Sequence, residues 1–233
     1  MDPVALSSRL LAVAVVLSVG RVAAETSASA SRSRPVEGPG VAPTRKVKAR
    51  PTTPGTLDGR PEPSLGIPTV HALGLMTAMR TAEAVLWPDP FAETRLERIG
   101  ARYQAAFSGP PVWDSDQPPF QWDGDPWVIN VVGHGLFGSE LYLRMRMCHN
   151  DILAATAFTV AGSTLWEYGF EANGVRPSAQ DLVYTPASGL VLGELRLWLW
   201  RLGAEAPDAT WARVLSWIAD PLGELERAAG SGC

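Results

Sequence analysis

The chain has 233 residues, enough for one medium-sized domain with a tail or for two small domains. Hydrophobic residues make up 46% and charged residues 19%, a balance typical of globular or membrane-peripheral proteins and not of disordered ones. A net charge of -4 argues against a nucleic-acid binder that depends on phosphate contacts, so we expect no nucleic-acid partner. Two cysteines exclude a disulfide framework and a four-cysteine zinc site.

The charges are unevenly distributed along the chain. Residues 1–60 carry nine basic and four acidic side chains, whereas residues 61–233 carry eleven basic and twenty acidic ones. This asymmetry predicts a basic tail joined to an acidic domain.

The N-terminal segment has the pattern of a secretory signal. A basic flank at Arg9 precedes an apolar run from Leu10 to Val19, and small residues at Val22-Ala23-Ala24 then offer a cleavage site. The run is short for a membrane span. We therefore expect a signal peptide at 1–24 and export across the inner membrane, to the periplasm or the membrane-associated cell envelope. An uncleaved signal anchor is the alternative.

Residues 25–64 are rich in Ser, Ala, Thr, Pro and Gly and have almost no large apolar side chains. Such a segment buries too little surface to offset its ordering entropy, which predicts a disordered basic linker. It serves either as a plain spacer or as a basic arm that touches anionic lipid headgroups or cell-wall polymer.

The remaining chain, 65–230, is predicted to be an all-α domain, a compact bundle of about five or six helices. Apolar residues at helical spacing predict a helix over 69–87, ended by Pro88, and a second one that begins at Pro90. A loop rich in Pro, Asp and Trp is expected over 108–126. The further predicted helical segments are 127–147, 152–172, 178–202 and 209–229, the last of them split or kinked by Pro221.

The central segments are unusually apolar but short. Ile152 to Trp166 contains no charged residue, nor does Leu182 to Gly193, yet a full membrane span needs about 20 apolar residues. The sequence therefore predicts buried, interfacial or re-entrant central helices. Trp198 and Trp200 resemble an interfacial aromatic flank, although core packing explains them equally well.

One stretch matches the sequence of a nucleotide-binding motif but lacks the flanking features of such a site. The stretch 133–138 fits G-x-G-x-x-G and follows a strand-like stretch, 128–132. No acidic residue appears about 20 positions later and no alternating strand–helix pattern follows, so we expect no dinucleotide cofactor. These glycines are predicted to permit close helix packing around His134. A structural or incidental free thiol is the preferred interpretation of Cys148, and the sequence leaves open the state of Cys148 and of Cys233.

A polar cluster stands out against the apolar background. Ser163, Glu167 and Glu171 recur at every fourth position and so share one helix face. Two glutamates at this spacing repel each other unless an arginine, a shared proton or a metal ion compensates them. His134, Glu167 and Glu171 are thus the candidate catalytic residues, and a metal site would use the same three with Asp181 added.

The alternative is a satisfied structural network in which arginines neutralise the acids and fix helix packing. Its expected members are Asn130, Ser163, Asp181, Glu194, Arg176 and Arg196. Asp181 also has a simple explanation, because Ser178 followed three residues later by an acid is typical of a helix N-terminus.

Several spaced motifs carry a family resemblance. They are the run 127–134 followed by Gly138, Tyr142 and Arg144; the run 163–168 with Glu171; and Arg176-Pro177-Ser178, Asp181-Leu182, Thr185-Pro186, Gly189 and Gly193-Glu194. Over roughly residues 110–202 the chain resembles the bacterial family catalogued as domain of unknown function 3943. The family's usual His-Pro is His134-Gly135 here.

The resemblance implies an exported envelope protein with a helical domain and buried polar positions, and it implies no established reaction. Two function classes remain. One is a non-catalytic, membrane-associated module whose partners are membrane or envelope components. The other is a metal-dependent or acid/base hydrolase or transferase acting on an envelope lipid or glycan, with His134 as base or ligand.

Overall fold

The computed structural model describes residues 61–206 and 208–233. The expected signal peptide at 1–24 and nearly all of the expected linker at 25–64 lie outside these residues, so both stay predictions. The described residues form helices and no β-sheet, which confirms the all-α prediction. One isolated parallel bridge joins Val112 to Ser178.

The helices follow one another in short steps along the chain. In order they are α2 (Gly66–Leu86), α3 (Pro88–Phe91), α4 (Leu96–Ser108), η1 (Val128–Gly133), α5 (His134–Met147), α6 (Ile152–Leu165), η2 (Trp166–Glu171), α7 (Ala179–Ala204), α8 (Thr210–Ala219) and α9 (Pro221–Ala228). The elements η1 and η2 are π-helical turns. Element η1 leads directly into α5, and η2 directly follows α6.

The described part of the chain has more separate helices than the five or six expected. The helix predicted from Pro90 is broken into α3 and α4, with a non-helical backbone at Asp89 and an interruption before Leu96. The last helix is split into α8 and α9 at Pro221, as predicted, because proline cannot continue the hydrogen-bonding pattern of α8.

The stretch 128–132 is helical, as expected for part of the predicted segment 127–147, although its residues are strand-like in composition. The carbonyl of Pro126 accepts hydrogen bonds from the amides of Ile129 and Asn130, which starts the helical turn. Asn130 is fully buried and its side-chain amide donates to Asp123. This tertiary environment overrides the β propensity of the valine and isoleucine residues around it.

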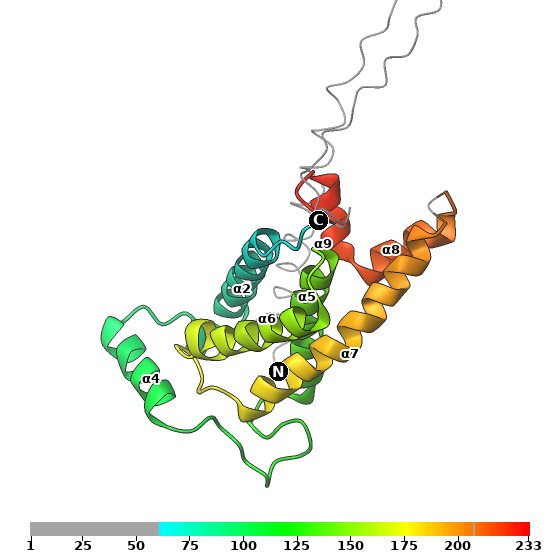
Figure 1. Ribbon diagram of the computed structural model, residues 1–233. Coiled ribbons are helices and arrows are strands. Elements are labelled where there is room, and N and C mark those ends of the chain that lie inside the picture. The colour runs from blue at the N-terminus through cyan, green and yellow to red at the C-terminus, as the bar shows by residue number, and fades with distance from the viewer. Residues whose placement is uncertain (1–60, 207) are drawn as a thin grey trace, which may run out of the picture. The chain divides into compact units, whose positions relative to one another are not determined.

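Helix α5 is the centre of the described domain, and all but two of its side chains are buried, the exceptions being Leu136 and Arg146. It packs against α6 and α7, and α2 also contacts it (Figure 1). Helix α8 runs back along the C-terminal half of α7. Helix α4 stands at the edge and contacts η2, where the Tyr103 hydroxyl donates to the carbonyl of Gly169.

Small residues allow α5 and α7 to cross closely. A Cβ added to Gly138 would overlap the carbonyl oxygen of Thr185, and a Cβ added to Gly193 would lie 2.5 Å from the Tyr142 ring. Of the G-x-G-x-x-G glycines, Gly138 therefore packs at this crossing, as the sequence predicted, whereas a Cβ added to Gly133 would meet only Ile129 at 4.0 Å. Ser178 caps α7 by accepting a hydrogen bond from the Asp181 amide at 3.1 Å, again as predicted.

Within the described residues, none of the helices combines the length and the apolar character that a membrane crossing requires.

Candidate functional site

A small cavity of about 60 Å³ lies where the loop before η1, the π-helical turn η2 and the start of α7 meet. Five carboxyl groups line it: Asp123, Asp125, Glu167, Glu171 and Asp181. Such a density of acids in a buried place needs compensation by protons, by basic side chains or by a cation.

Both π-helical turns contribute to this region. Glu167 and Glu171 belong to η2, whereas η1 carries Asn130, which donates to Asp123, and leads directly into His134, the first residue of α5. Short π-helical stretches inside longer helices are frequent at functional sites.

Hydrogen bonds fix some of the carboxyl oxygens and leave others unpaired. The backbone amide of Ser178 donates to Glu167 Oε2 at 2.7 Å, and the Ser178 hydroxyl donates to Asp123 Oδ2 at 2.7 Å. Asn130 donates to the other Asp123 oxygen, also at 2.7 Å. By contrast, Glu167 Oε1 is buried and has no hydrogen-bond partner among the described residues.

The imidazole of His134 lies beside Asp181. Its Nδ1 is 3.0 Å from the Thr185 hydroxyl, and its Nε2 is 3.6 Å from Asp181 Oδ2. Burial lowers the pKa of His134 to about 4, so the ring is neutral at pH 7. A neutral ring with one nitrogen engaged leaves the other able to accept a proton or to bind a metal ion.

The carboxyl groups do not share one protonation state. Burial raises the pKa of Glu167 to about 8, and burial with hydrogen bonding to Asp123 raises that of Asp181 to about 9. The pKa of Glu171 is also well above its ordinary value, because of burial and the nearby Glu167. Burial alone would raise the pKa of Asp123. Its hydrogen bonds outweigh this effect and lower the pKa below its ordinary value, and the bond from Ser178 contributes most.

The family comparison covers this pocket. Residues 119–222 match the family model described as Domain of unknown function (DUF3943). This segment, which is less than half of the chain, is similar to that family. The match confirms the resemblance expected from the sequence and extends it into the start of α9. No curated protein and no solved structure shows significant similarity to the chain.

Some of the predicted network residues lie at the pocket, and others lie away from it. Asn130 contacts Asp123, and Ser163 donates to the backbone carbonyl of Asp181 at 3.2 Å. Arg176 lines the cavity, yet its guanidinium donates to the carbonyl of Pro110. No salt bridge within 61–206 and 208–233 reaches Glu167 or Glu171 from an arginine.

Glu194 and Arg196 lie away from the pocket. Glu194 accepts hydrogen bonds from the Tyr142 hydroxyl and from Arg146, both at 2.7 Å. Arg196 pairs with Glu140 at 2.6 Å and also donates to Ser139. The predicted polar residues therefore divide among three places: the pocket, the contacts of Glu194 and the contacts of Arg196.

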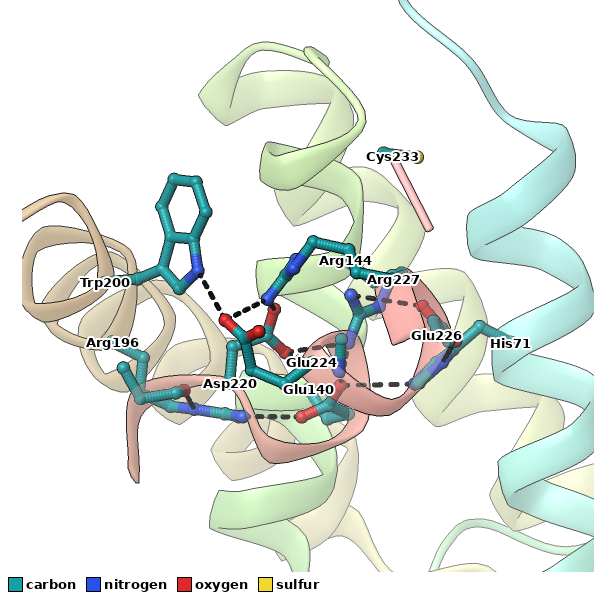
Figure 2. Close-up of polar contacts among 12 residues, drawn as sticks. His71, Glu140, Arg144, Arg196, Trp200, Asp220, Glu224, Glu226, Arg227 and Cys233 are labelled. Atoms are coloured by element: carbon teal, nitrogen blue, oxygen red, sulfur yellow. Dashed lines mark hydrogen bonds and ion pairs between the residues drawn. The ribbon is translucent and has the colours of Figure 1, made fainter. Parts of the chain in front are cut away.

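Arg196 belongs to a second buried network, which joins α2, α5, α7 and α9 (Figure 2). Arg144 lies at its centre and pairs with Glu140 at 2.8 Å and with Asp220 at 2.9 Å. His71 of α2 bridges the carboxylates of Glu140 and Glu226. Acids and bases alternate in this network, so that basic side chains compensate its buried carboxylates.

Sequence reasoning missed Asp123 and Asp125 as pocket residues. The predicted loop over 108–126 is rich in acids, but a loop has no periodicity from which the direction of a side chain follows. The available signal was the number of acids in a loop that leads into a buried helix.

The free-thiol interpretation of Cys148 is wrong. Cys148, which follows the end of α5, forms a disulfide with Cys233 across 85 residues of sequence. The sequence spacing could not reveal this pair, because two cysteines so far apart meet only through the tertiary fold.

Proposed function

We propose that the chain is an exported cell-envelope protein whose DUF3943-like domain is a non-catalytic helical module that rests on a membrane surface. One observation carries the membrane part of this proposal. Helix α6 has no charged residue, and yet Leu153 is 78% exposed and Ile152, Val160 and Leu165 are exposed as well. Soluble domains normally cover such a surface with charged side chains.

Two other helices also expose apolar side chains. Helix α7 packs against α6 and exposes Val183, Val191 and Trp198, and α8, which packs against α7, exposes Trp211 and Trp217. Tryptophan is enriched where proteins meet the membrane–water boundary, since its ring is apolar and its N–H is polar. Fourteen residues make α6 about 21 Å long at 1.5 Å per residue. We therefore propose that it lies along the interface.

The export part rests on two supports. The first is the signal-like pattern predicted for residues 1–24. The second is the disulfide between Cys148 and Cys233, because such bonds persist in oxidising compartments such as the periplasm and are rare in the cytosol.

The experiment is flotation of the purified chain on a density gradient with vesicles of phosphatidylethanolamine and phosphatidylglycerol. The expected result is that the wild-type chain floats with the vesicles and that a Leu153→Ser, Val160→Ser double variant floats much less. Leu96→Ser is the matched control, because Leu96 is an exposed leucine on α4. A wild-type chain that stays at the bottom of the gradient contradicts the proposal, as does equal flotation of all variants.

A metal-dependent or acid/base hydrolase or transferase is the second candidate. The grouping of His134 with Glu167 and Asp181 favours it, because active sites shift pKa values in opposite directions. We place it second because the cavity of about 60 Å³ is far smaller than the roughly 300–1,000 Å³ typical of ligand pockets. A hydrolysis screen on envelope lipids and glycans, with Glu167→Gln as the inactive comparison, tests it.

A further inference from the structure

We propose that His134, Glu167 and Asp181 bind one divalent transition-metal ion, such as Zn²⁺ or Mn²⁺, inside the DUF3943-like domain. This inference is independent of the membrane proposal, because it concerns the interior of the domain and not its surface.

The first support is geometric. One ligand atom from each of the three side chains lies within 4.8 Å of the others, and all three residues are buried. They come from the start of α5, from η2 and from the first turn of α7, so the fold alone assembles them. One imidazole nitrogen with two carboxylates is a donor set that suits zinc, manganese or iron better than calcium or magnesium.

The second support is an unpaired atom. Glu167 is 2% exposed, and its Oε1 has no hydrogen-bond partner in the described part of the chain. Its other oxygen is held by the backbone amide of Ser178, so the carboxylate orientation is fixed. A buried carboxylate oxygen without a partner is costly, and a metal ion at this place would satisfy it.

The third support is the way His134 is held. Its Nδ1 is engaged by the Thr185 hydroxyl at 3.0 Å, which leaves Nε2 on the side of Asp181. Histidines that bind metals usually have their second nitrogen engaged in this manner, since it fixes the ring orientation.

The charge of the pocket completes the argument. Among the described residues, no arginine or lysine pairs with any of the five carboxyl groups that line the cavity. Glu167 and Asp181 line this cavity, and its volume of about 60 Å³ has room for an ion with one water, which occupies about 30 Å³ in the liquid. Asp123, Asp125 and Glu171 remain to hold that water.

The test uses the full mature chain, purified in mild detergent and stripped with a chelator. Mn²⁺, Zn²⁺ and Co²⁺ are titrated separately by calorimetry, and the Co²⁺ absorption spectrum reports its ligands. We expect about one ion per chain and a gain in thermal stability. Affinity should fall at least about 100-fold in Glu167→Gln and Asp181→Asn, because loss of a ligand should exceed the 10–100-fold cost of losing an outer partner.

Asp114→Asn is the matched control, because Asp114 is an exposed acid of the same loop and does not line the cavity. It should bind as the wild type does. His134→Gln should change the Co²⁺ spectrum even where some binding remains, which separates a ligand from a merely structural residue.

Three results would overturn the proposal: no binding of any of the three ions to the stripped wild-type chain, unchanged affinity in both carboxylate variants, or a His134→Gln spectrum identical to that of the wild type. If the stripped Glu167→Gln chain is more stable than the wild type and no ion binds, the pocket is a proton-sharing cluster instead. Vesicle flotation does not depend on these outcomes, so the two proposals fail separately.

Discussion

Gly138 of α5 and Gly189 of α7 meet where the two helices cross, and a Cβ built on Gly189 would lie 2.8 Å from the carbonyl oxygen of Gly138. This close crossing has a consequence for the pocket. Thr185, one turn before Gly189, packs against Gly138 and holds the ring of His134. The distance between the two helix backbones therefore sets where His134 lies relative to Asp181.

We expect Gly138→Ala to destabilise the domain by about 1–3 kcal/mol or more, because the added methyl group would overlap the backbone of Thr185, which cannot move without separating the helices. Gly74→Ala on α2 is the control. Nothing lies within 4 Å of a Cβ there, so alanine should be neutral or stabilise by up to about 1 kcal/mol. Urea unfolding of both variants measures the difference, and equal stabilities would contradict the close crossing.

Much of the fold could be predicted from the sequence, because apolar spacing and helix caps are local features of the chain. The apolar segments at 127–147, 152–172 and 178–202 each became one continuous helical element, and Ser178 capped the third. What the strand-like composition of 128–132 could not show is that Asn130 is buried against Asp123 in the loop that precedes it.

In the candidate site, too, the local spacing could be predicted from the sequence and the tertiary contacts could not. The four-residue spacing of Glu167 and Glu171 placed both on one face, and both line the cavity. What the spacing could not show is whether an arginine pairs with these two glutamates. Arg196 pairs with Glu140 instead, through a contact between α5 and α7 that only the tertiary fold creates.

Arg144 tests whether the second network supports the fold. Its side chain is 1% exposed and compensates the buried carboxylates of Glu140 and Asp220. Arg144→Met should cost about 3 kcal/mol, because it removes the most buried cation from both carboxylates, although Glu140 keeps Arg196 and Asp220 keeps Arg227. Arg95→Met is the control, since that arginine is 60% exposed and pairs with Glu93 at the surface, so its loss should change stability little. Denaturant unfolding distinguishes them, and equal losses would refute a supporting role.

His71 should make stability depend on pH. Burial and Arg144 would lower its pKa, but hydrogen bonds to Glu140 and Glu226 outweigh both and raise it. A raised folded-state pKa means that the stabilisation is complete below the unfolded value of about 6.5 and is lost as the pH rises through the folded-state value. Wild type should exceed His71→Gln by about 1.5–3 kcal/mol at pH 6. The difference should shrink as the pH rises to 9.

The measurement for His71 is the free energy of unfolding of both chains in urea at pH 6, 7, 8 and 9. Subtracting the variant from the wild type cancels groups that titrate in both, the pocket carboxyls included. A difference that stays constant across this range would show that His71 contributes packing and no charge.

The disulfide between Cys148 and Cys233 should contribute about 2–4 kcal/mol, because it closes a long loop and so restricts the unfolded chain. It also joins the C-terminal end to the point where the carbonyl of Cys148 accepts a hydrogen bond from the Ser64 amide. Reduction should therefore lower the stability of the wild type and leave a Cys148→Ser, Cys233→Ser double variant unchanged. Two thiols that react with a thiol reagent in the denatured, non-reduced chain would contradict the disulfide and weaken the case for export.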